Sequence, residues 1–221
     1  MIDQATLNAY RTDGAVALRN IIAPEWVARL REGVAENMAQ PGPFAKRYTP
    51  EGQPGLFFGD YCNWQRIDAY RAFFFDSPLK HTAAALMGSP KVNLYHEHVL
   101  VKEPGTKEKT PWHHDQPYYP VDGEDIVSFW IPLDPVEQRT CPDYIAGSHR
   151  WGRWFTPARF ADLKSHAAAR FRRASRVRMR ALCCAAASCR RHRPSVMGRC
   201  RALGCYLGGG VGEISTVQML I

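Results

Sequence analysis

The 221-residue chain lacks any apolar run that approaches the ~20 residues needed for a membrane-spanning helix. Its first residues, Met1–Gln4, contain neither a basic segment nor an apolar core, so the sequence shows no sign of a secretory signal. We therefore expect a cytoplasmic protein that does not enter a membrane. The hydrophobic share of 45% is ordinary for a globular protein, and the length is sufficient to bury a substantial core.

Lysine and negative charge are almost absent from the last quarter of the chain. Residues 167–221 contain 11 arginines, no lysine and one acidic residue, Glu213, whereas residues 1–166 contain 18 basic and 20 acidic residues. The formal net charge of +8 therefore comes from the C-terminal segment alone. Cysteine is distributed in the same way, since 5 of the 7 cysteines follow residue 182. We interpret the chain as a domain at 1–166 followed by an Arg/Ala/Cys-rich tail at 167–221.

The arginines of the tail are a candidate surface for the phosphates of RNA or of a membrane. However, the tail lacks the interleaved aromatic residues that form a stacking platform for bases. Its cysteines and His192 include no Cys-x-x-Cys pair of the kind that binds zinc. We therefore expect neither nucleic acid nor membrane as a partner, and the sequence does not specify an oligomeric state.

The spacing of apolar residues predicts helices in the first 90 residues and strands after them. The helical pattern covers residues 4–13, 24–40 and 68–88. Ser77-Pro78 divides the last of these into two helices, with Ser77 as the N-cap and Pro78 as the first residue of the second helix. The strand pattern covers residues 15–18, 92–102, 126–133 and 144–146. Residues 44–66 are expected to form a loop over the mouth of the domain. Helices followed by short strands are typical of an α+β protein with a double-sheet β core.

The segment Pro111–Pro120 contains the motif His-x-Asp, at His113 and Asp115. On an extended strand, residues i and i+2 point to the same face, so this segment could offer a nitrogen and an oxygen donor to one metal ion. Both are ligand types of the 2-His-1-carboxylate triad of non-haem Fe(II) oxygenases. Flanking aromatic residues such as Trp112 are typical of ligand pockets. A surface loop with a turn-forming carboxylate is the alternative explanation.

Two other histidine positions compete with this motif. His96 and His98 have the same i, i+2 spacing on their own predicted strand, beside Glu97. Histidines in such a position are more often packed side chains or groups that orient a ligand than metal ligands. His149 follows the tight turn Gly147-Ser148, where it would either hydrogen-bond the turn or line the pocket.

Four motifs follow one another between residues 99 and 152. They are Val99-Leu-Val-Lys-Glu-Pro-Gly105, Pro111-Trp-His-His-Asp-Gln-Pro-Tyr-Tyr-Pro120, Ser128-Phe-Trp-Ile-Pro-Leu-Asp134 and Ala146-Gly-Ser-His-Arg-Trp-Gly152. Together they resemble the phytanoyl-CoA dioxygenase family, whose members are Fe(II)- and 2-oxoglutarate-dependent oxygenases. The segments Gly59–Trp64 and Tyr10–Gly14 also fit, so the resemblance covers about residues 5–163.

The resemblance implies a double-stranded β-helix, a cupin-like jelly roll with N-terminal helices and iron at one mouth. It implies that His113 and Asp115 are iron ligands, with no catalytic residue beyond the metal ligands. Trp130 and Val99 match positions beside the 2-oxoglutarate, and His114 stands near the co-substrate where the family often has Gln. Such a dioxygenase, an oxidoreductase, consumes O2 and oxidises a small-molecule substrate. A carboxylate at position 115 favours hydroxylation over halogenation.

The tail departs from the pattern of the family. The resemblance requires a second histidine on a later strand and, about ten residues on, an arginine that binds the distal carboxylate of 2-oxoglutarate. The nearest matches are His166 or His192 for the ligand and Arg199 or Arg201 for the arginine. None of these residues lies in a strand pattern.

The composition of residues 167–221 leads to the hypothesis that this tail is out of frame relative to the ancestral gene. A GC-rich gene read in the wrong frame gives such an excess of Arg, Ala and Cys. We then expect the C-terminal strands of the β core to be missing or disordered. The function inferred is a non-haem Fe(II)/2-oxoglutarate-dependent dioxygenase that hydroxylates a small organic substrate. The alternative is a catalytically inactive, truncated remnant of that fold.

Overall fold

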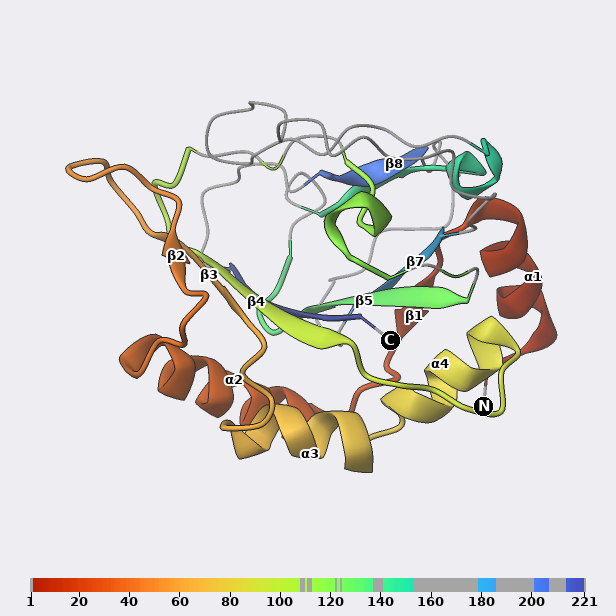
Figure 1. Cartoon of the computed structure of the whole chain (residues 1–221), viewed down its shortest axis with the longest axis horizontal. Coiled ribbons are helices and arrows are strands. Elements are labelled where there is room, and N and C mark those ends of the chain that lie inside the picture. The colour runs from red at the N-terminus through yellow and green to blue at the C-terminus, as the bar shows by residue number, and fades with distance from the viewer. Residues whose placement is uncertain are drawn as a thin grey trace.

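The computed structural model describes residues 2–107, 110, 113–121, 123, 125–136, 141–152, 179–185, 201–206 and 214–220. In the three ranges after residue 178 it describes the backbone and, of the side chains, only that of Val217. Helices and a mixed sheet form an α+β fold, which confirms the predicted class (Figure 1). No helix in these ranges is long and apolar enough to cross a membrane.

The described helices agree closely with the sequence patterns. They are α1 (Gln4–Asp13), α2 (Pro24–Ala39), α3 (Asp68–Asp76) and α4 (Leu79–Met87). Asp3 caps α1 by accepting a hydrogen bond of 2.7 Å from the backbone N of Thr6, and Gly14 ends the helix with a left-handed φ of 83°. The N-cap of α4 is Pro78, one residue later than predicted. Ser77 Oγ accepts a hydrogen bond from the backbone N–H of Leu79.

One sheet contains seven of the described strands, in the order β1-β7-β5-β9-β4-β3-β2. Their bounds are Ala17–Arg19 (β1), Lys46–Arg47 (β2), Phe57–Tyr61 (β3), His96–Lys102 (β4), Ile126–Pro132 (β5), Met179–Ala185 (β7) and Ile214–Leu220 (β9). Strand β7 runs parallel to β1 and β5, and the other pairs are antiparallel. Strands β6 (Asp143–Ile145) and β8 (Arg201–Tyr206) form a separate antiparallel ladder.

The two faces of the sheet are covered differently. Helices α2, α3 and α4 lie along one face (Figure 1), where alternate strand residues join one hydrophobic core: Val99, Val101, Val127, Phe129, Ile131 and Val217. The intervening residues Leu100 and Trp130 pack on the opposite face, with Ala15 and Tyr144 in a second, smaller cluster. This second face carries the candidate site.

Two regions differ from the sequence expectation. Residues 44–66 form β2 and β3 rather than only a loop, because β3 pairs with β4 along its whole length. The tail, where strands were expected to be missing or disordered, contains β7, β8 and β9. Strand β9 inserts between β4 and β5, so long-range pairing rather than a local pattern defines it. The strand order by itself does not establish the jelly roll that the resemblance implies, so the jelly roll stays a prediction.

Candidate metal and co-substrate site

The predicted metal ligands lie together in the segment between β4 and β5. His113 Nε2 lies 3.2 Å from Asp115 Oδ1, and each side chain is 11% exposed. Asp115 has helical backbone angles (φ −70°, ψ −38°) because it immediately precedes the 3-10 helix η1 (Gln116–Tyr118). A turn, rather than the extended strand assumed from the spacing, therefore brings the carboxylate to the imidazole.

The separation of these two atoms fits a shared metal ion. Ligands at about 2.1 Å from an ion and at right angles to each other are about 3 Å apart. The observed 3.2 Å between His113 Nε2 and Asp115 Oδ1 agrees with that geometry. Within the described residues no group of three His, Cys, Asp or Glu side chains could hold a metal. Among the described residues, His113 and Asp115 are therefore two candidates for the three ligands that the triad requires.

The electrostatics of Asp115 keep its carboxylate in the form that binds metal. Burial acts to raise the pKa of Asp115, but the hydrogen bond and charge interaction with His113 and the hydrogen bond from Ser128 outweigh it, so the pKa lies below its usual value. Ser128 lies on β5, on the face opposite the helices, so the strand places its hydroxyl at the site. The carboxylate is therefore ionised at neutral pH, as metal binding requires.

The second histidine pair lies beside these donors, on β4. Burial lowers the pKa of His96 and of His98 to about 4, and both side chains interact electrostatically with Asp115. Their rings contact Tyr61, at centroid distances of 5.9 and 5.6 Å respectively. His98 Nε2 is buried and has no hydrogen-bond partner in the described part of the chain. Both imidazoles are neutral at physiological pH and face the site.

The predicted co-substrate residues fall on different faces. Trp130, on β5, is 3% exposed, shares its face with Ser128, and has a buried Nε1 atom without a hydrogen-bond partner among the described residues. His114 is partly buried next to Asp115 in the chain. The side chain of Val99 is fully buried in the helix-side core, on the opposite face of the sheet. The alternation along β4 therefore separates Val99 from the other candidates.

The Gly-Ser-His turn is fixed to α1. It leads into the 3-10 helix η3 (Ser148–Arg150). The backbone N of Gly147 donates to the carbonyl of Asp13 (2.8 Å), and His149 Nε2 lies 3.1 Å from the carbonyl oxygen of Arg11. A Cβ atom at Gly14 would lie 2.2 Å from His149 Nδ1. The turn thus anchors the end of α1, a role different from the two that the sequence suggested for His149, which were bonding its own turn or lining the pocket.

Several candidates lie outside the described residues. These are His166 and His192 as the third ligand, Arg199 as the arginine for 2-oxoglutarate, and the flanking Trp112. The backbone of Arg201 belongs to β8, but its side chain is outside the described set. Their roles stay predictions.

Sequence reasoning did not single out a buried cation on the site face of β4. Lys102 is 8% exposed, and its Nζ lies 4.4 Å from the centroid of the Phe57 ring, to which it is paired across the strands. The sequence did contain a signal for this residue, because Lys102 lies in the motif Val99–Gly105, the first of the four motifs that carry the family resemblance. Tyr61 and Tyr95, beside the histidines, were also not assigned a role, whereas Tyr119 belongs to the aromatic residues that flank the His-x-Asp motif and were taken as a sign of a ligand pocket.

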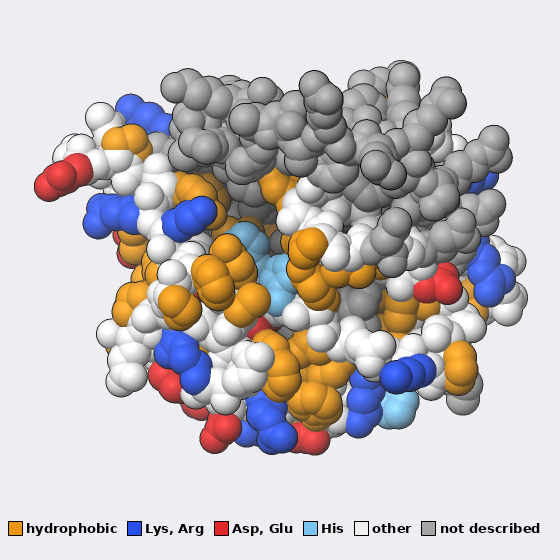
Figure 2. Space-filling view, in the orientation of Figure 1, with side chains coloured by type: hydrophobic (Ala, Val, Ile, Leu, Met, Phe, Trp, Pro, Cys, Tyr) orange, Lys and Arg blue, Asp and Glu red, His pale blue; other side chains and the backbone are white. Residues whose placement is uncertain are grey.

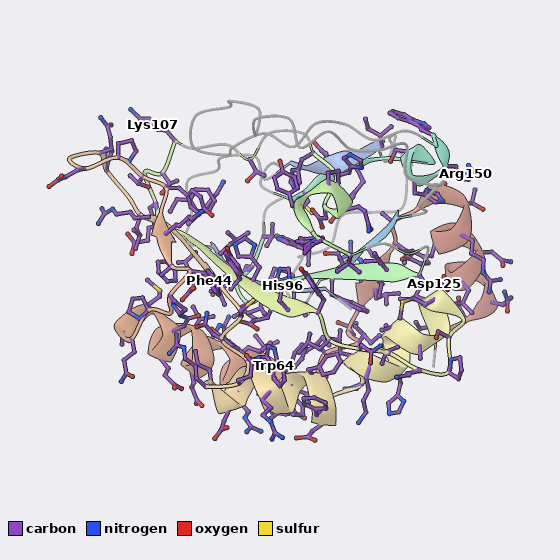
Figure 3. All side chains as sticks on the ribbon, in the orientation of Figure 1. Phe44, Trp64, His96, Lys107, Asp125 and Arg150 are labelled. Carbon is purple, nitrogen blue, oxygen red and sulfur yellow. The ribbon has the colours of Figure 1, made fainter. Side chains whose placement is uncertain are left out.

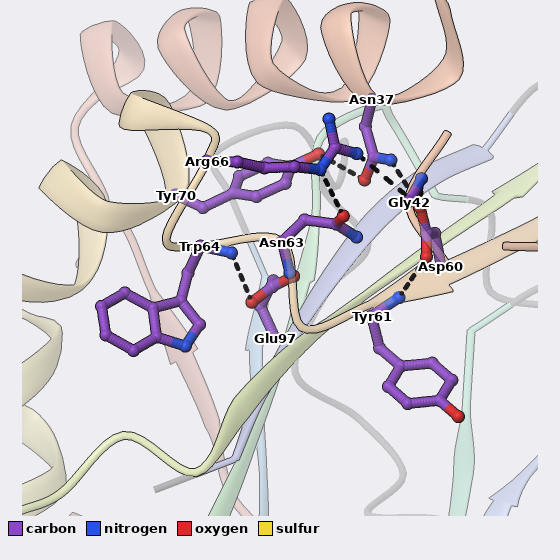
Figure 4. A network of polar contacts seen from close by, with 9 residues as sticks. All are labelled: Asn37, Gly42, Asp60, Tyr61, Asn63, Trp64, Arg66, Tyr70 and Glu97. Atoms are coloured by element: carbon purple, nitrogen blue, oxygen red, sulfur yellow. Dashed lines mark hydrogen bonds and ion pairs between the residues drawn. The ribbon is translucent and has the colours of Figure 1, made fainter. Parts of the chain in front are cut away.

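Beneath the site, buried polar contacts join β3 to α2 and to the loop that follows it (Figure 4). Asp60 is fully buried, and its Oδ2 accepts hydrogen bonds of 2.7 Å from Asn37 Nδ2 and from the backbone N of Gly42. Arg66 lies 3.9 Å from the same oxygen. These contacts satisfy a carboxylate that would otherwise be costly to bury.

A second buried carboxylate fixes β4 itself. Glu97 is fully buried and accepts hydrogen bonds from the backbone N atoms of Asn63 and Trp64 (Figure 4). Burial raises its pKa to about 7, although the backbone donors act in the opposite direction. Because Glu97 lies between His96 and His98, this anchor holds the strand that presents both imidazoles to the site.

Comparison with known proteins identifies the family. The phytanoyl-CoA dioxygenase (PhyH) family matches residues 10–182, and the chain belongs to this family of Fe/2-oxoglutarate-dependent oxygenases. The match runs beyond residue 166, where the sequence placed the start of the tail. No curated protein sequence matches the chain.

Solved structures share the fold at low sequence identity. SnoK, a non-haem alpha-ketoglutarate-dependent carbocyclase from nogalamycin biosynthesis, superposes with a TM-score of 0.69 at 17% identity, covering 99% of this chain and 83% of SnoK. The epimerase SnoN, in complex with Fe3+, alpha-ketoglutarate and nogalamycin RO, gives 0.63 at 18%, covering 99% and 82%. EctD from S. alaskensis, with 2-oxoglutarate and 5-hydroxyectoine, gives 0.58 at 13%, covering 99% and 75%.

Proposed function

We propose that the protein is an Fe(II)- and 2-oxoglutarate-dependent dioxygenase that hydroxylates a small organic substrate. The observation that carries the proposal is the pairing of His113 Nε2 with an ionised Asp115 at 3.2 Å, a distance that suits two neighbouring ligands of one ion. Membership of the PhyH family supports the assignment of iron, 2-oxoglutarate and O2. We further propose that the β core is the jelly roll of such oxygenases.

In this proposal, Fe(II) with 2-oxoglutarate supplies the activation of O2, and the residues of the chain supply binding and orientation. His113 and Asp115 hold the metal, and the hydrogen bonds of Asp115 with His113 and with Ser128 favour its ionised form. Trp130 forms an apolar wall that excludes water, and its buried Nε1–H, which has no partner among the described residues, is available to a polar group of a ligand. His114 lies next to the metal ligands in the chain and contacts the co-substrate.

Two strand positions on β4 complete the proposed co-substrate site. Val99 contributes through the backbone of the strand, since its side chain faces the helices. Lys102 places a buried positive charge on the site face, where it attracts a carboxylate of the co-substrate. A Lys102→Met variant should raise the KM for 2-oxoglutarate more than it changes kcat.

The test of the proposed function is production of succinate from 2-oxoglutarate after anaerobic loading with Fe(II) and admission of O2. We expect His113→Ala and Asp115→Ala each to abolish Fe(II) binding and succinate formation. The exposed residues His81 and Asp76, on α4 and α3, supply matched controls, because His81→Ala and Asp76→Ala remove the same chemical groups away from the site. Unchanged iron binding in both site variants would refute the assignment of the ligands.

The inactive remnant of the fold is the second candidate. The observation that favours it is that the described residues contain no group of three His, Cys, Asp or Glu side chains that could hold a metal ion. A folded protein that binds no Fe(II) and releases no succinate, at any concentration of 2-oxoglutarate, would establish the remnant. Stoichiometric Fe(II) binding with release of succinate would exclude it.

A further inference from the structure

Aromatic rings lead from His96, which interacts electrostatically with Asp115, to the protein surface. Tyr119 lies 5.2 Å from His96, and Tyr95 lies 5.5 Å from Tyr119 and 4.9 Å from His96, between ring centroids. Tyr61 also lies 5.9 Å from His96 and stacks at 4.7 Å on Phe44, with only 12° between the ring planes. We call these five side chains the aromatic platform.

The outer rings of the platform are exposed to solvent. Phe44 is 43% and Tyr95 is 39% exposed, which places both among the few large hydrophobic residues that the described part of the chain leaves open. Figure 2 shows histidine side chains at the bottom of a hollow flanked by hydrophobic side chains. Figure 3 shows Phe44 and His96 close together at the β3–β4 end of the sheet. Exposed aromatic groups gathered at one hollow mark a binding site rather than a core.

The platform is built from four separate segments of the chain. Phe44 precedes β2, Tyr61 ends β3, Tyr95 and His96 lie at the start of β4 with Tyr95 just before the strand, and Tyr119 follows η1. The buried contacts of Asp60 and Glu97 fix β3 and β4 on the other face of the sheet, and Figure 4 shows Tyr61 pointing away from that network. The fold therefore holds the rings in place without using them to fill its core.

The chemistry of the platform selects an uncharged ligand. Burial raises the pKa of Tyr61 and of Tyr95, so both hydroxyl groups stay protonated at neutral pH and can donate hydrogen bonds. Phe44 carries no polar group. A ligand ring can stack in an offset or edge-to-face manner on such rings, at centroid distances of about 4.5–7 Å. An extended anionic ligand would find no countercharge on these five side chains.

We propose that this oxygenase takes a planar, uncharged aromatic substrate, which stacks on the aromatic platform with one edge toward His113 and Asp115. The inference rests on the proposed function for the identity of the reacting centre. It goes further by naming the substrate class and the residues that select it.

The test is equilibrium binding of 1,4-dihydroxyanthraquinone to the full chain. Binding is measured by isothermal titration calorimetry without added iron or 2-oxoglutarate. Decanoyl-CoA serves as an extended anionic comparison and maltotriose as an uncharged, non-aromatic one. We expect the quinone to bind and the other two to bind at least ten times more weakly. Tight binding of decanoyl-CoA or maltotriose, or no binding of the quinone, would overturn the proposal.

Variants locate the binding on the platform. Tyr61→Leu and Tyr95→Leu should each weaken quinone binding by about 2- to 12-fold, as expected for the loss of one aromatic contact. Tyr61→Phe should weaken binding less than Tyr61→Leu, because it loses the hydroxyl group but keeps the ring. Phe75→Leu is the control, since Phe75 is 41% exposed but lies on α3, among Trp64 and Phe74. Equal affinities in wild type and both leucine variants would refute the assignment.

The outcome is separable from that of the proposed function. Quinone binding that depends on Tyr61 and Tyr95, in a protein that forms no succinate, would support the ring site and refute turnover. Succinate formation with quinone binding unaffected by either leucine substitution would support turnover and refute the ring site. Thermal unfolding of each variant by circular dichroism shows that the compared proteins are folded.

Discussion

Glu97 should make the stability of this protein fall as the pH rises toward neutrality. The carboxyl group is fully buried between two histidine positions of β4, where burial raises its pKa from 4.5 to about 7. The backbone N–H groups of Asn63, Trp64 and Glu97 itself favour the ionised form, and the nearby charge of Asp60 opposes it. The direction of the shift shows that burial outweighs the donors.

The magnitude follows from the difference between the two pKa values. A folded-state pKa of about 7 and a model value of 4.5 differ by 2.5 units, which corresponds to about 3 kcal/mol at 1.36 kcal/mol per unit. Because the folded-state pKa is the higher one, the folded state holds the proton more tightly. The stabilisation is therefore fully present below pH 4.5 and is lost as the pH rises to about 7.

Urea unfolding of wild type and Glu97→Gln at pH 5, 6, 7 and 8 tests this reasoning. The variant cannot ionise at this position, so the difference in unfolding free energy between the two proteins isolates the titration of Glu97. Wild type should lose stability relative to the variant by up to about 3 kcal/mol over this range. A difference that is constant with pH, or that changes in the opposite direction, would show that the backbone donors dominate over burial.

Three further predictions concern the anchor of the turn, the core and the metal. Gly14→Ala should destabilise the protein by more than Gly52→Ala in urea unfolding, because both glycines have a positive φ (83° and 79°) but only a Cβ at Gly14 meets His149. Phe129→Ala should cost about 3–5 kcal/mol in the same assay, against less than about 1 for the exposed Phe75→Ala, and equal losses would contradict the assigned core. Chelation with EDTA should abolish succinate formation, and added Fe(II) should restore it.

The helices could be predicted from the sequence because their signals are local. The Asp3 cap, the Gly14 end and the break at Ser77-Pro78 each lie within a few residues of the feature they define. The strand β3 was missed because it is determined by pairing with β4, which is distant in the sequence, and not by a local pattern. Gly59 weakens a strand by its own preference, yet a Cβ there would lie 2.8 Å from the Tyr48 ring, so the packing requires the glycine.

The candidate site was predictable in its residues but not in its geometry. His113 and Asp115 were found from a two-residue spacing, and they do lie together, although through a turn rather than a strand. Val99 was taken from a motif, whereas the alternation along β4 turns its side chain to the helices. A motif identifies a segment, and only the pairing of strands decides which of its side chains share a face.

The C-terminal strand β9 gives the sharpest test of the expectation that the C-terminal strands of the β core are missing or disordered. The strand pairs with β4 on one side and β5 on the other, and the buried Val217 lies opposite Val99 and Ile131. If the tail contributes nothing, a chain ending at residue 213 should have the same melting temperature and solubility as the full chain. If β9 is part of the sheet, its removal exposes two strand edges, and the shortened protein should aggregate.

A point substitution in β9 distinguishes the contribution of the strand's packing from the other effects of shortening the chain. Val217→Ala should lower the unfolding free energy by roughly 2 kcal/mol, because it removes a fully buried side chain from between two others. Val92→Ala is the matched control, since Val92 is only partly buried and lies before β4, and its cost should be less than half as large. Equal small effects, together with an unaffected shortened chain, would show that the sheet does not depend on β9. A large effect would mean that the tail is structural, whatever the reading frame from which it arose.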